Sequence, residues 1–118
     1  MTGGGSGIGA GIVSAFAAQQ ADVTFFDVSK DGSEAVAKAS GARFERVDLT
    51  RIADTQERIG QLIAEGGSFD VLVNNAANDD RHGVDEVTEE YWDDRVNVNL
   101  KHLFFCAQSV IPGMRVKR

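Results

Sequence analysis

The sequence predicts an α/β fold with a doubly wound parallel sheet, and three observations support this class. Apolar periodicity alternates between two-residue and 3.6-residue spacing throughout the 118 residues, as expected for strands and helices that follow one another in turn. A glycine-rich turn at residues 2–9 opens the first predicted helix. Asp27 follows the first predicted strand, at the edge of the sheet where such folds bind their ligands.

The first half of the chain predicts two helices and two strands in alternation. Ile8, Ile12 and Phe16 recur every four residues among alanines, which indicates a helix with one buried stripe. The β-branched and aromatic run that follows is typical of a strand. The elements expected are a helix at 8–20, a strand at 23–26, a helix at 31–39 and a strand at 44–47.

The second half predicts a helix, a strand and a long helix. Ile52, Ile59 and Leu62 share one helical face before Gly66 and Gly67 end the helix. Nearly continuous apolar residues then indicate a strand buried on both faces. A polar loop separates this strand from a long helix with acidic residues in its first turn. The strand, the loop and the long helix are expected at 69–73, 78–85 and 88–115.

The composition is that of a globular protein, and it disfavours several function classes. With a net charge of −6, the chain has no overall field that would attract a nucleic acid. No apolar stretch approaches the roughly 20 residues of a membrane span, and the N-terminus lacks the layout of a signal peptide. We therefore expect a cytoplasmic protein without membrane contact. His82, His102 and the single cysteine, Cys106, lack the spacing of metal ligands, so no structural metal is expected.

A phosphate-binding turn at residues 2–9 is the first candidate site. Its glycines let the backbone approach a ligand closely, and the helix that follows places free N–H groups and the positive end of its dipole at one point. A P-loop would need Lys and then Ser or Thr after its last glycine, but Ile8 follows Gly7. The turn therefore favours the pyrophosphate of a dinucleotide over a nucleoside triphosphate.

Asp27 is the second candidate, because it follows Gly7 by about the 20 positions at which dinucleotide-binding proteins place an acidic residue on the adenosine ribose. A carboxylate there repels the 2′-phosphate of NADP, and the next residue, Val28, supplies no cation to offset it. This predicts NAD as the cofactor. The alternative is a solvated aspartate that only ends a strand.

Taken together, the motifs resemble those of short-chain dehydrogenases/reductases in order and spacing. They are Thr-Gly-x-x-x-Gly-Ile-Gly at 2–9, Asp27, Asp48-Leu49, Asn-Asn-Ala-Ala at 74–77 and Asn-Val-Asn-Leu at 97–100. The resemblance covers essentially the whole chain and implies a partial, Rossmann-like NAD-binding domain over residues 1–118. A methyltransferase on a similar sheet would not account for the asparagine motifs.

The resemblance implies a role for each motif. The glycine turn would line the pyrophosphate and ribose, and Asp27 would bind the adenosine ribose. Asp48 and Leu49 would flank the adenine, while residues 75–77 would pass beneath the nicotinamide ribose. Ala77 departs slightly from the family, whose motif usually ends in glycine. The cofactor-binding residues so implied are Gly3, Ser6, Gly7, Ile8, Gly9, Asp27, Asp48, Leu49, Asn75, Ala76 and Ala77.

Asn99 resembles the asparagine of the family's catalytic Asn-Ser-Tyr-Lys set, where a break in the long helix holds a water of the proton relay. The segments at 78–82 and 90–92 resemble a subgroup that oxidises aldoses such as galactose, fucose, rhamnose or arabinose to lactones. On this resemblance Asn78 and His82 are candidate substrate residues, with an ordinary charged surface loop as the alternative. The implied reaction is hydride transfer between an alcohol or sugar hemiacetal carbon and NAD.

Three catalytic residues of the family have no counterpart in these 118 residues. The only tyrosine, Tyr91, precedes Asn99 and is followed four positions later by Arg95, where the family has lysine. Only Met1 precedes the turn, where the family has its first strand. We therefore expect the cofactor-binding half of a longer protein, truncated so that the first strand and the C-terminal half are missing, and inactive alone. A catalytically inactive dinucleotide-binding or interaction module is the alternative.

The long helix at 88–115 is the expected contact of a homo-oligomer. In the family this helix packs across a subunit interface with the helix that carries the catalytic tyrosine. Without that partner its apolar side chains would form an exposed patch, which favours self-association. These side chains are Leu103, Phe104, Val110, Ile111 and Met114.

Overall fold

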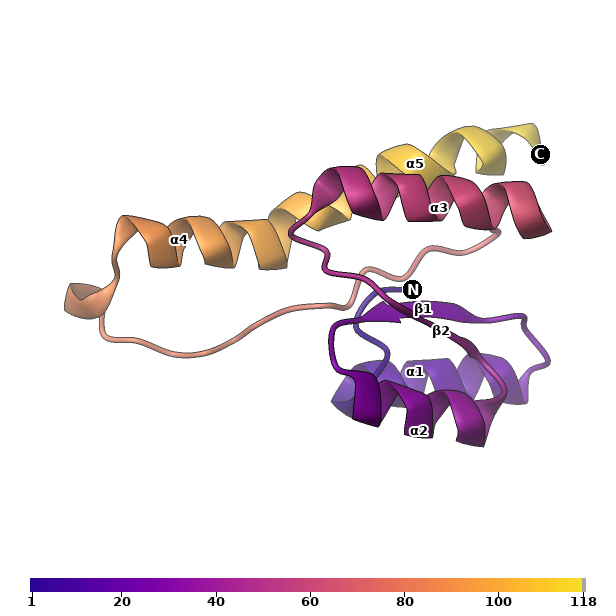
Figure 1. Ribbon diagram of the computed structural model, residues 1–118, viewed down its shortest axis with the longest axis horizontal. Coiled ribbons are helices and arrows are strands. Elements are labelled where there is room, and N and C mark those ends of the chain that lie inside the picture. The colour runs from indigo at the N-terminus through magenta and orange to yellow at the C-terminus, as the bar shows by residue number, and fades with distance from the viewer. Residues whose placement is uncertain (118) are drawn as a thin grey trace. The chain divides into compact units, whose positions relative to one another are not determined.

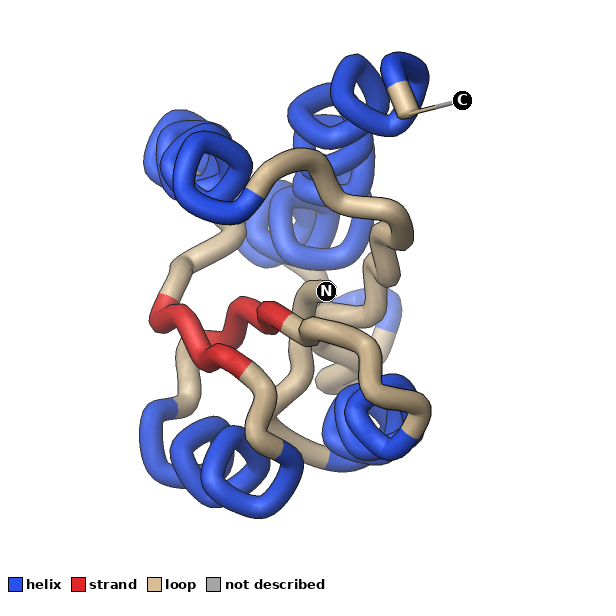
Figure 2. Tube along the Cα trace, turned by 90° about the vertical axis from the view of Figure 1, so that its right-hand side faces the viewer, coloured by secondary structure: helices blue, strands red, loops and turns tan. Residues whose placement is uncertain are grey.

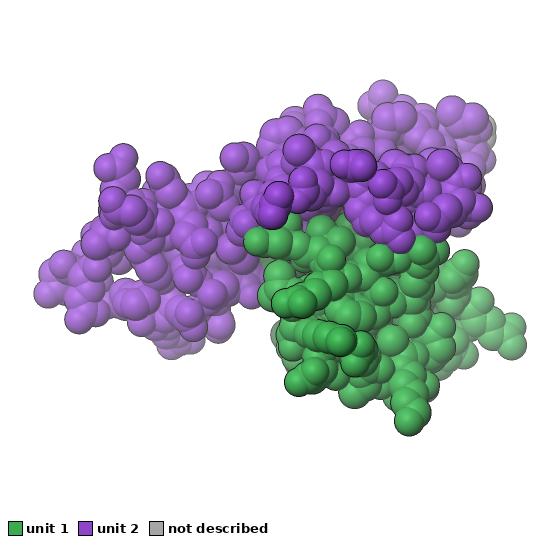
Figure 3. All heavy atoms as spheres, viewed as in Figure 1, with its two compact units in different colours: residues 1–48, 73–76 green, residues 49–72, 77–118 purple. Residues whose placement is uncertain are grey.

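The computed structural model describes residues 1–117, and the chain divides into two compact units (Figure 3). Unit 1 comprises residues 1–48 and 73–76, and unit 2 comprises residues 49–72 together with those from 77 onward. Both units are discontinuous in sequence. The glycine turn and Asp27 belong to unit 1, whereas Asn99 belongs to unit 2.

Unit 1 contains a parallel pair of strands and two helices (Figures 1 and 2). The elements are α1 (Gly7–Ala18), β1 (Thr24–Asp27), α2 (Lys30–Ser40) and β2 (Arg43–Arg46). Both views show α1 and α2 beside each other on the same face of the strand pair. All four elements predicted in this half are confirmed, with their ends shifted by no more than two residues.

The core of unit 1 is formed by small and aromatic side chains. Val13, Phe25 and Ala42 are buried together, and the Phe25 ring stacks on that of Phe44 with 5.5 Å between centroids. The stripe predicted for α1 is wrong at its first residue, because Ile8 is 79% exposed. The buried face instead contains Gly9 and Val13, since the absence of a side chain at Gly9 allows a close approach of the backbone.

Residues 1–3 lie beside β1 and form isolated bridges, but no strand, in agreement with the expected loss of the first strand. The Thr2 N–H donates to the Val73 carbonyl at 2.9 Å, and the Gly3 N–H donates to the Phe26 carbonyl at 2.8 Å. Thr2 thereby makes parallel bridges to Phe26 on one side and to Asn74 on the other. The spatial order is β2, β1, residues 1–3 and residues 73–74, which is the 3-2-1-4 order of a doubly wound sheet.

Unit 2 is helical in most of its length. Its elements are α3 (Ile52–Gly66), a 3₁₀ turn η1 (Val84–Glu86), α4 (Glu89–Val96), a π-helical turn η2 (Asn97–Lys101) and α5 (His102–Val116). α3 packs beside α5 (Figure 1), with Ile59 and Leu62 on its buried face. The predicted long helix is correct in extent but is interrupted by the π turn. None of the helices in residues 1–117 has both the length and the apolar content of a membrane span.

The strand predicted at 69–73 is wrong. This segment forms no strand, and Val71 is 57% exposed rather than buried. Backbone pairing begins only at Val73 and Asn74, which meet Thr2. A strand requires the N–H and C=O groups of a neighbouring strand, and residues 1–3 provide them only for its last residues.

Candidate functional site

The glycine turn has a backbone that favours glycine at two positions. Gly3 has φ +67° and Gly7 has φ +51°, in the left-handed region that residues with a Cβ rarely adopt. A Cβ on Gly3 would also lie 2.7 Å from the Ala76 Cα, and one on Gly9 would collide with the Gly3 carbonyl oxygen. At Gly3 and Gly9 the backbone is therefore packed tightly against its neighbours, with no space for a side chain.

The start of α1 offers free hydrogen-bond donors. The first N–H groups of a helix have no partner within it, and those of Gly7, Ile8 and Gly9 meet no acceptor among the described residues. Ser6 is the N-cap residue, and its hydroxyl makes no capping bond. At Gly7 nothing lies within 4 Å of the position of a Cβ. These donors and this open space suit a phosphate group.

Asp27 is fixed at the edge of the turn by two backbone hydrogen bonds. Its Oδ2 accepts the Gly5 N–H at 2.8 Å, and its Oδ1 accepts the Ser29 N–H at 2.9 Å. A carboxylate has about four acceptor positions, so both oxygens retain capacity for ribose hydroxyls. Asp27 is thus oriented by the turn itself and is more than a solvated end of β1.

Arg46 is a neighbour of Asp27 that sequence reasoning missed. In the register of the strand pair Arg46 lies opposite Asp27, and its Nε donates to the Val28 carbonyl at 3.3 Å. Val28 itself supplies no cation, as predicted, but a guanidinium from β2 reaches the backbone beside it. Only the strand register could have revealed this, because Arg46 is remote from Asp27 in sequence.

Asn75 and Ala76 are tied to the glycine turn through Thr2. The buried Thr2 Oγ1 accepts the N–H groups of Asn75 at 3.0 Å and Ala76 at 3.1 Å. The Asn75 Nδ2 donates to the Gly3 carbonyl at 2.8 Å. Within unit 1 the structure therefore brings Gly3, Gly9, Asn75 and Ala76 together, as the motifs implied.

The other implied cofactor residues are Asp48, Leu49 and Ala77. Asp48, the last residue of the first segment of unit 1, is exposed. Leu49 and Ala77 belong to unit 2, where Leu49 is 8% exposed and Ala77 is exposed. Leu49 therefore offers little surface to a ligand, and the adenine role of Asp48 and Leu49 remains a prediction.

Asn99 lies within the π-helical turn, which confirms the predicted break in the long helix. Its Oδ1 accepts the Asn78 N–H at 2.7 Å, and its Nδ2 donates to the Asn78 carbonyl at 2.9 Å. One side chain thus satisfies both backbone groups of one loop residue. π turns are rare and occur often at functional sites, so this arrangement supports a functional role for Asn99.

His102 follows the π turn and was not singled out as a site residue from the sequence. It is fully buried, and its Nδ1 lies 2.7 Å from the Val98 carbonyl. Burial lowers the pKa of His102, and the hydrogen bond to Val98 opposes this only in part. His102 is therefore neutral at pH 7, with Nδ1–H donating to Val98 inside the turn that carries Asn99.

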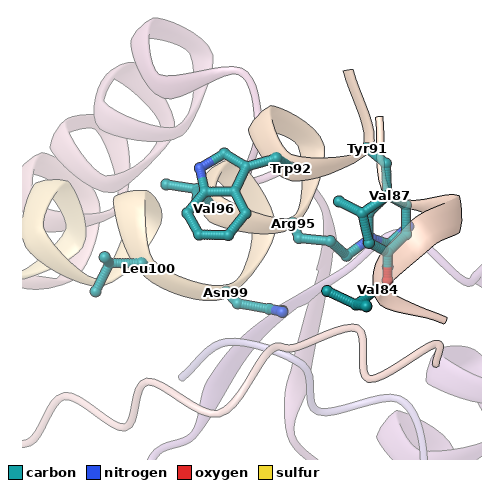
Figure 4. Close-up of a pocket in the computed structure, with 8 residues that line it drawn as sticks. All are labelled: Val84, Val87, Tyr91, Trp92, Arg95, Val96, Asn99 and Leu100. Atoms are coloured by element: carbon teal, nitrogen blue, oxygen red, sulfur yellow. The ribbon is translucent and has the colours of Figure 1, made fainter. Parts of the chain in front are cut away.

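Of the two candidate substrate residues, only His82 contacts α4. The Asn78 Oδ1 accepts the Asp80 N–H at 3.0 Å, and the His82 ring meets the Tyr91 ring edge-on, with 4.3 Å between centroids. An open cavity of about 520 Å³ lies beside α4, and Figure 4 labels the eight residues that line it. Tyr91, Arg95 and Asn99 are among them, but Asn78 and His82 are not.

Comparison with known proteins gives a consistent result. A family model described as short chain dehydrogenase matches residues 1–118. The chain is 49% identical to a D-xylose 1-dehydrogenase of Caulobacter vibrioides, over 98% of this chain and 47% of that protein. It is 45% identical to a probable galactose dehydrogenase of Rhizobium meliloti, with the same coverage. A solved short-chain dehydrogenase/reductase of Serratia marcescens matches with a TM-score of 0.87 and 32% identity, over 96% of this chain and 49% of its own. The chain therefore spans about half the length of these relatives.

Proposed function

Because this chain belongs to the short-chain dehydrogenase family, we propose that residues 1–118 are the NAD-binding part of an oxidoreductase that acts on sugars. The Rossmann-like α/β fold expected from the motifs is confirmed by the solved relatives. A bound NAD would accept the hydride from the hemiacetal carbon of an aldose, and a base would take the hydroxyl proton, so that a lactone would form. The base and its partners would come from sequence outside these residues.

The observation that carries the proposal is the glycine turn with its free donors. The N–H groups of Gly7, Ile8 and Gly9, together with the positive end of the α1 dipole, would bind the pyrophosphate. Ser6 would add its uncommitted hydroxyl. Free backbone N–H groups and the positive end of the helix dipole are a common means by which proteins bind a phosphate group.

Asp27 carries the preference for NAD in this proposal. With both oxygens oriented by backbone N–H groups, it would accept the adenosine ribose hydroxyls and repel a 2′-phosphate. Arg46 would have the opposite effect and attract a 2′-phosphate, since its guanidinium lies near the same end of the strand pair. We propose that the carboxylate dominates because it is fixed at the turn, whereas Arg46 is exposed.

On the nicotinamide side, residues 75–77 would support the ribose and Asn99 would contribute to the proton relay. Asn75 and Ala76 are held against the glycine turn by Thr2, which supports the first assignment. The π turn around Asn99 supports the second. The names of the two sugar dehydrogenase relatives and the polar segment 78–82, with Asn78 and His82, favour an aldose as substrate.

We also propose that the protein is a homo-oligomer through the helices at 88–115. Of the side chains expected to form an exposed patch, Phe104 is 64% exposed and Ile111 is exposed, but Val110 is buried. Trp92 and Leu100 add apolar surface that sequence reasoning did not include. Exposed apolar side chains that form a contiguous patch favour association.

Calorimetric titration with NADH and NADPH tests the cofactor proposal. We expect NADH to bind one site with an affinity at least about tenfold above that of NADPH, a difference of about 1.4 kcal/mol. Tighter binding of NADPH would overturn the role given to Asp27. Absence of binding by either cofactor would favour an interaction module instead.

Turnover of NAD by the full-length protein with a panel of aldoses tests the reaction. The panel should contain D-xylose, D-galactose, L-arabinose and L-fucose, with a simple secondary alcohol as a control. We expect oxidation of at least one aldose in preference to the alcohol. NADH binding without turnover of any aldose would reject the sugar assignment.

A further inference from the structure

Ser33 is a fully buried residue of α2 whose hydroxyl has no hydrogen-bond partner. The residue is 0% exposed, and within residues 1–117 its Oγ meets neither a donor nor an acceptor. Buried polar side chains are hydrogen-bonded in the large majority of cases, and leaving one unpaired costs stability. The retention of this hydroxyl is explained if a partner becomes available in another state of the protein.

Ser33 packs against the glycine turn at Gly5. A Cβ on Gly5 would collide with the Ser33 Oγ. The preceding residue of α2, Gly32, also approaches the turn, because a Cβ on it would lie 2.8 Å from the Gly5 carbonyl oxygen. The first turn of α2 is therefore in direct contact with the backbone of the glycine turn. All three residues belong to unit 1.

The Asp27 carboxylate lies on the same side of Gly5 as the Ser33 hydroxyl. Its Oδ2 would be 2.9 Å from a Cβ on Gly5, and it accepts the Gly5 N–H at 2.8 Å. The Ser33 Oγ and the Asp27 Oδ2 therefore lie close to one point, although no hydrogen bond joins them. Asp27 is partly exposed and Ser33 is buried, so a ligand can reach the carboxylate but not the hydroxyl.

The Asp27 carboxylate can accept one more donor on each oxygen. Each carboxylate oxygen accepts about two hydrogen bonds. Oδ2 already has the Gly5 N–H, and Oδ1 has the Ser29 N–H. A serine hydroxyl supplies one donor, and that of Ser33 can turn towards Oδ2 without giving up another bond. The Ser33 hydroxyl is therefore available as a second donor to Oδ2 from the buried side.

We propose that Ser33 is a positioning residue, whose hydroxyl donates to the Asp27 Oδ2 when the adenosine ribose binds and so leaves Oδ1 to the ribose. This inference rests on the proposed function and deepens it. A bound ribose displaces water from the carboxylate, and a carboxylate without water gains more from a protein donor. Held from the buried side, the carboxylate keeps one orientation. This favours the ribose of NAD and keeps a negative charge where NADP carries its 2′-phosphate.

Ser33→Ala in the full-length protein tests this role through cofactor affinity and stability together. By calorimetric titration we expect the Kd of NADH to rise about threefold to tenfold and that of NADPH to change by less than about twofold. The midpoint of urea denaturation without cofactor should not fall, because alanine removes an unpaired buried hydroxyl. A residue that served only packing would lower this midpoint and weaken the binding of both cofactors alike.

Ser40→Ala is the matched control at the other end of α2. The Ser40 Oγ donates to the Val36 carbonyl at 2.7 Å and accepts the Ala42 N–H at 3.2 Å. Its loss should therefore lower the urea midpoint and leave both cofactor affinities unchanged, which is the reverse of the result expected for Ser33→Ala. The double variant Asp27→Ala/Ser33→Ala should bind NADH as Asp27→Ala does, because Ser33 acts through Asp27.

The outcomes separate this inference from the proposed function. If the wild-type protein binds NADH more tightly than NADPH but Ser33→Ala keeps both affinities, only the inference is wrong. Equal losses for the two cofactors in Ser33→Ala would reject a role in positioning the carboxylate, as would a further loss of NADH affinity when Ser33→Ala is added to Asp27→Ala. A wild-type protein that binds neither cofactor, or prefers NADPH, rejects the proposed cofactor and, with it, the role of Ser33.

Discussion

Gly9 and Gly11 lie two residues apart in α1 but have opposite surroundings. A Cβ on Gly9 would overlap the Gly3 carbonyl oxygen, whereas nothing lies within 4 Å of one on Gly11. We expect Gly9→Ala to lower the free energy of unfolding by about 1–3 kcal/mol and to abolish NADH binding. Gly11→Ala should raise it by about 0.5–1 kcal/mol because alanine favours the helix. Urea denaturation measures both, and a Gly9→Ala variant of wild-type stability would contradict the tight turn.

Asp27 and Arg46 should have opposite effects on cofactor choice. We expect Asp27→Ser to weaken NADH binding about tenfold, because the ribose loses its acceptor, and to strengthen NADPH binding, because repulsion of the 2′-phosphate is removed. The double variant Asp27→Ser/Arg46→Ala should lose the gain for NADPH. Fluorescence titration with each cofactor gives the affinities. Equal NADPH affinity in the wild type and both variants would show that neither residue lies near the 2′ position.

The residues of the site differ in how far sequence could predict them. Asp27, Asn75 and Asn99 lie in motifs, so their spacing along the chain was enough to single them out as candidates. Arg46 approaches Asp27 only through the strand register, which no local pattern encodes. His102 becomes notable only through its complete burial, and a single histidine in an apolar sequence does not reveal that it will be buried.

At the scale of elements, the π turn illustrates a limit of periodicity. Apolar spacing predicted one continuous helix at 88–115, and its extent agrees with α4, η2 and α5. The break at 97–101 was expected only from the resemblance, since one widened turn changes the spacing too little to detect. The strand expected at 69–73 failed for a different reason: apolar composition predicts burial but does not specify a pairing partner.

The π turn should make the stability of the fold sensitive to acid through His102. Burial lowers the pKa of His102 from 6.5, so the unfolded chain binds a proton more readily than the folded one. Stability from this residue is full above pH 6.5 and is lost as the pH falls towards the folded pKa. We expect the free energy of unfolding to fall between pH 7.5 and 5.5, and to fall less in His102→Gln. Parallel slopes in urea titrations of the two proteins would contradict this.

At the scale of the whole molecule, the two compact units had no visible boundary in the sequence. Residues 73–76 join unit 1 although they follow 24 residues of unit 2, namely 49–72. A linker is recognised in a sequence by its composition. Here the chain changes unit after residues 48, 72 and 76, and no change in composition marks these positions. The sequence predicted one domain over residues 1–118, whereas the structure divides the same helices and strands between two compact units.

Self-association should depend on the exposed apolar side chains of α4, η2 and α5. We expect light scattering at high concentration to give a mass above that of the monomer, and Leu100→Gln/Phe104→Gln to restore the monomer. Both side chains are more than 60% exposed, so these changes should not disturb folding. Val116→Gln is the control, since Val116 is also exposed but lies at the end of α5. A monomeric wild-type protein would reject the association surface.

The two bonds accepted by the Thr2 hydroxyl span 73 and 74 positions of the chain, and this separation sets an order of events in folding. Closing so long a loop costs entropy before any contact rewards it, so these bonds should form after the transition state. We expect Thr2→Val to accelerate unfolding with little effect on the refolding rate, as stopped-flow kinetics would measure. During synthesis, the glycine turn then acquires its contacts with Asn75 and Ala76 only after residue 76 has left the ribosome, although its glycines are among the first residues made.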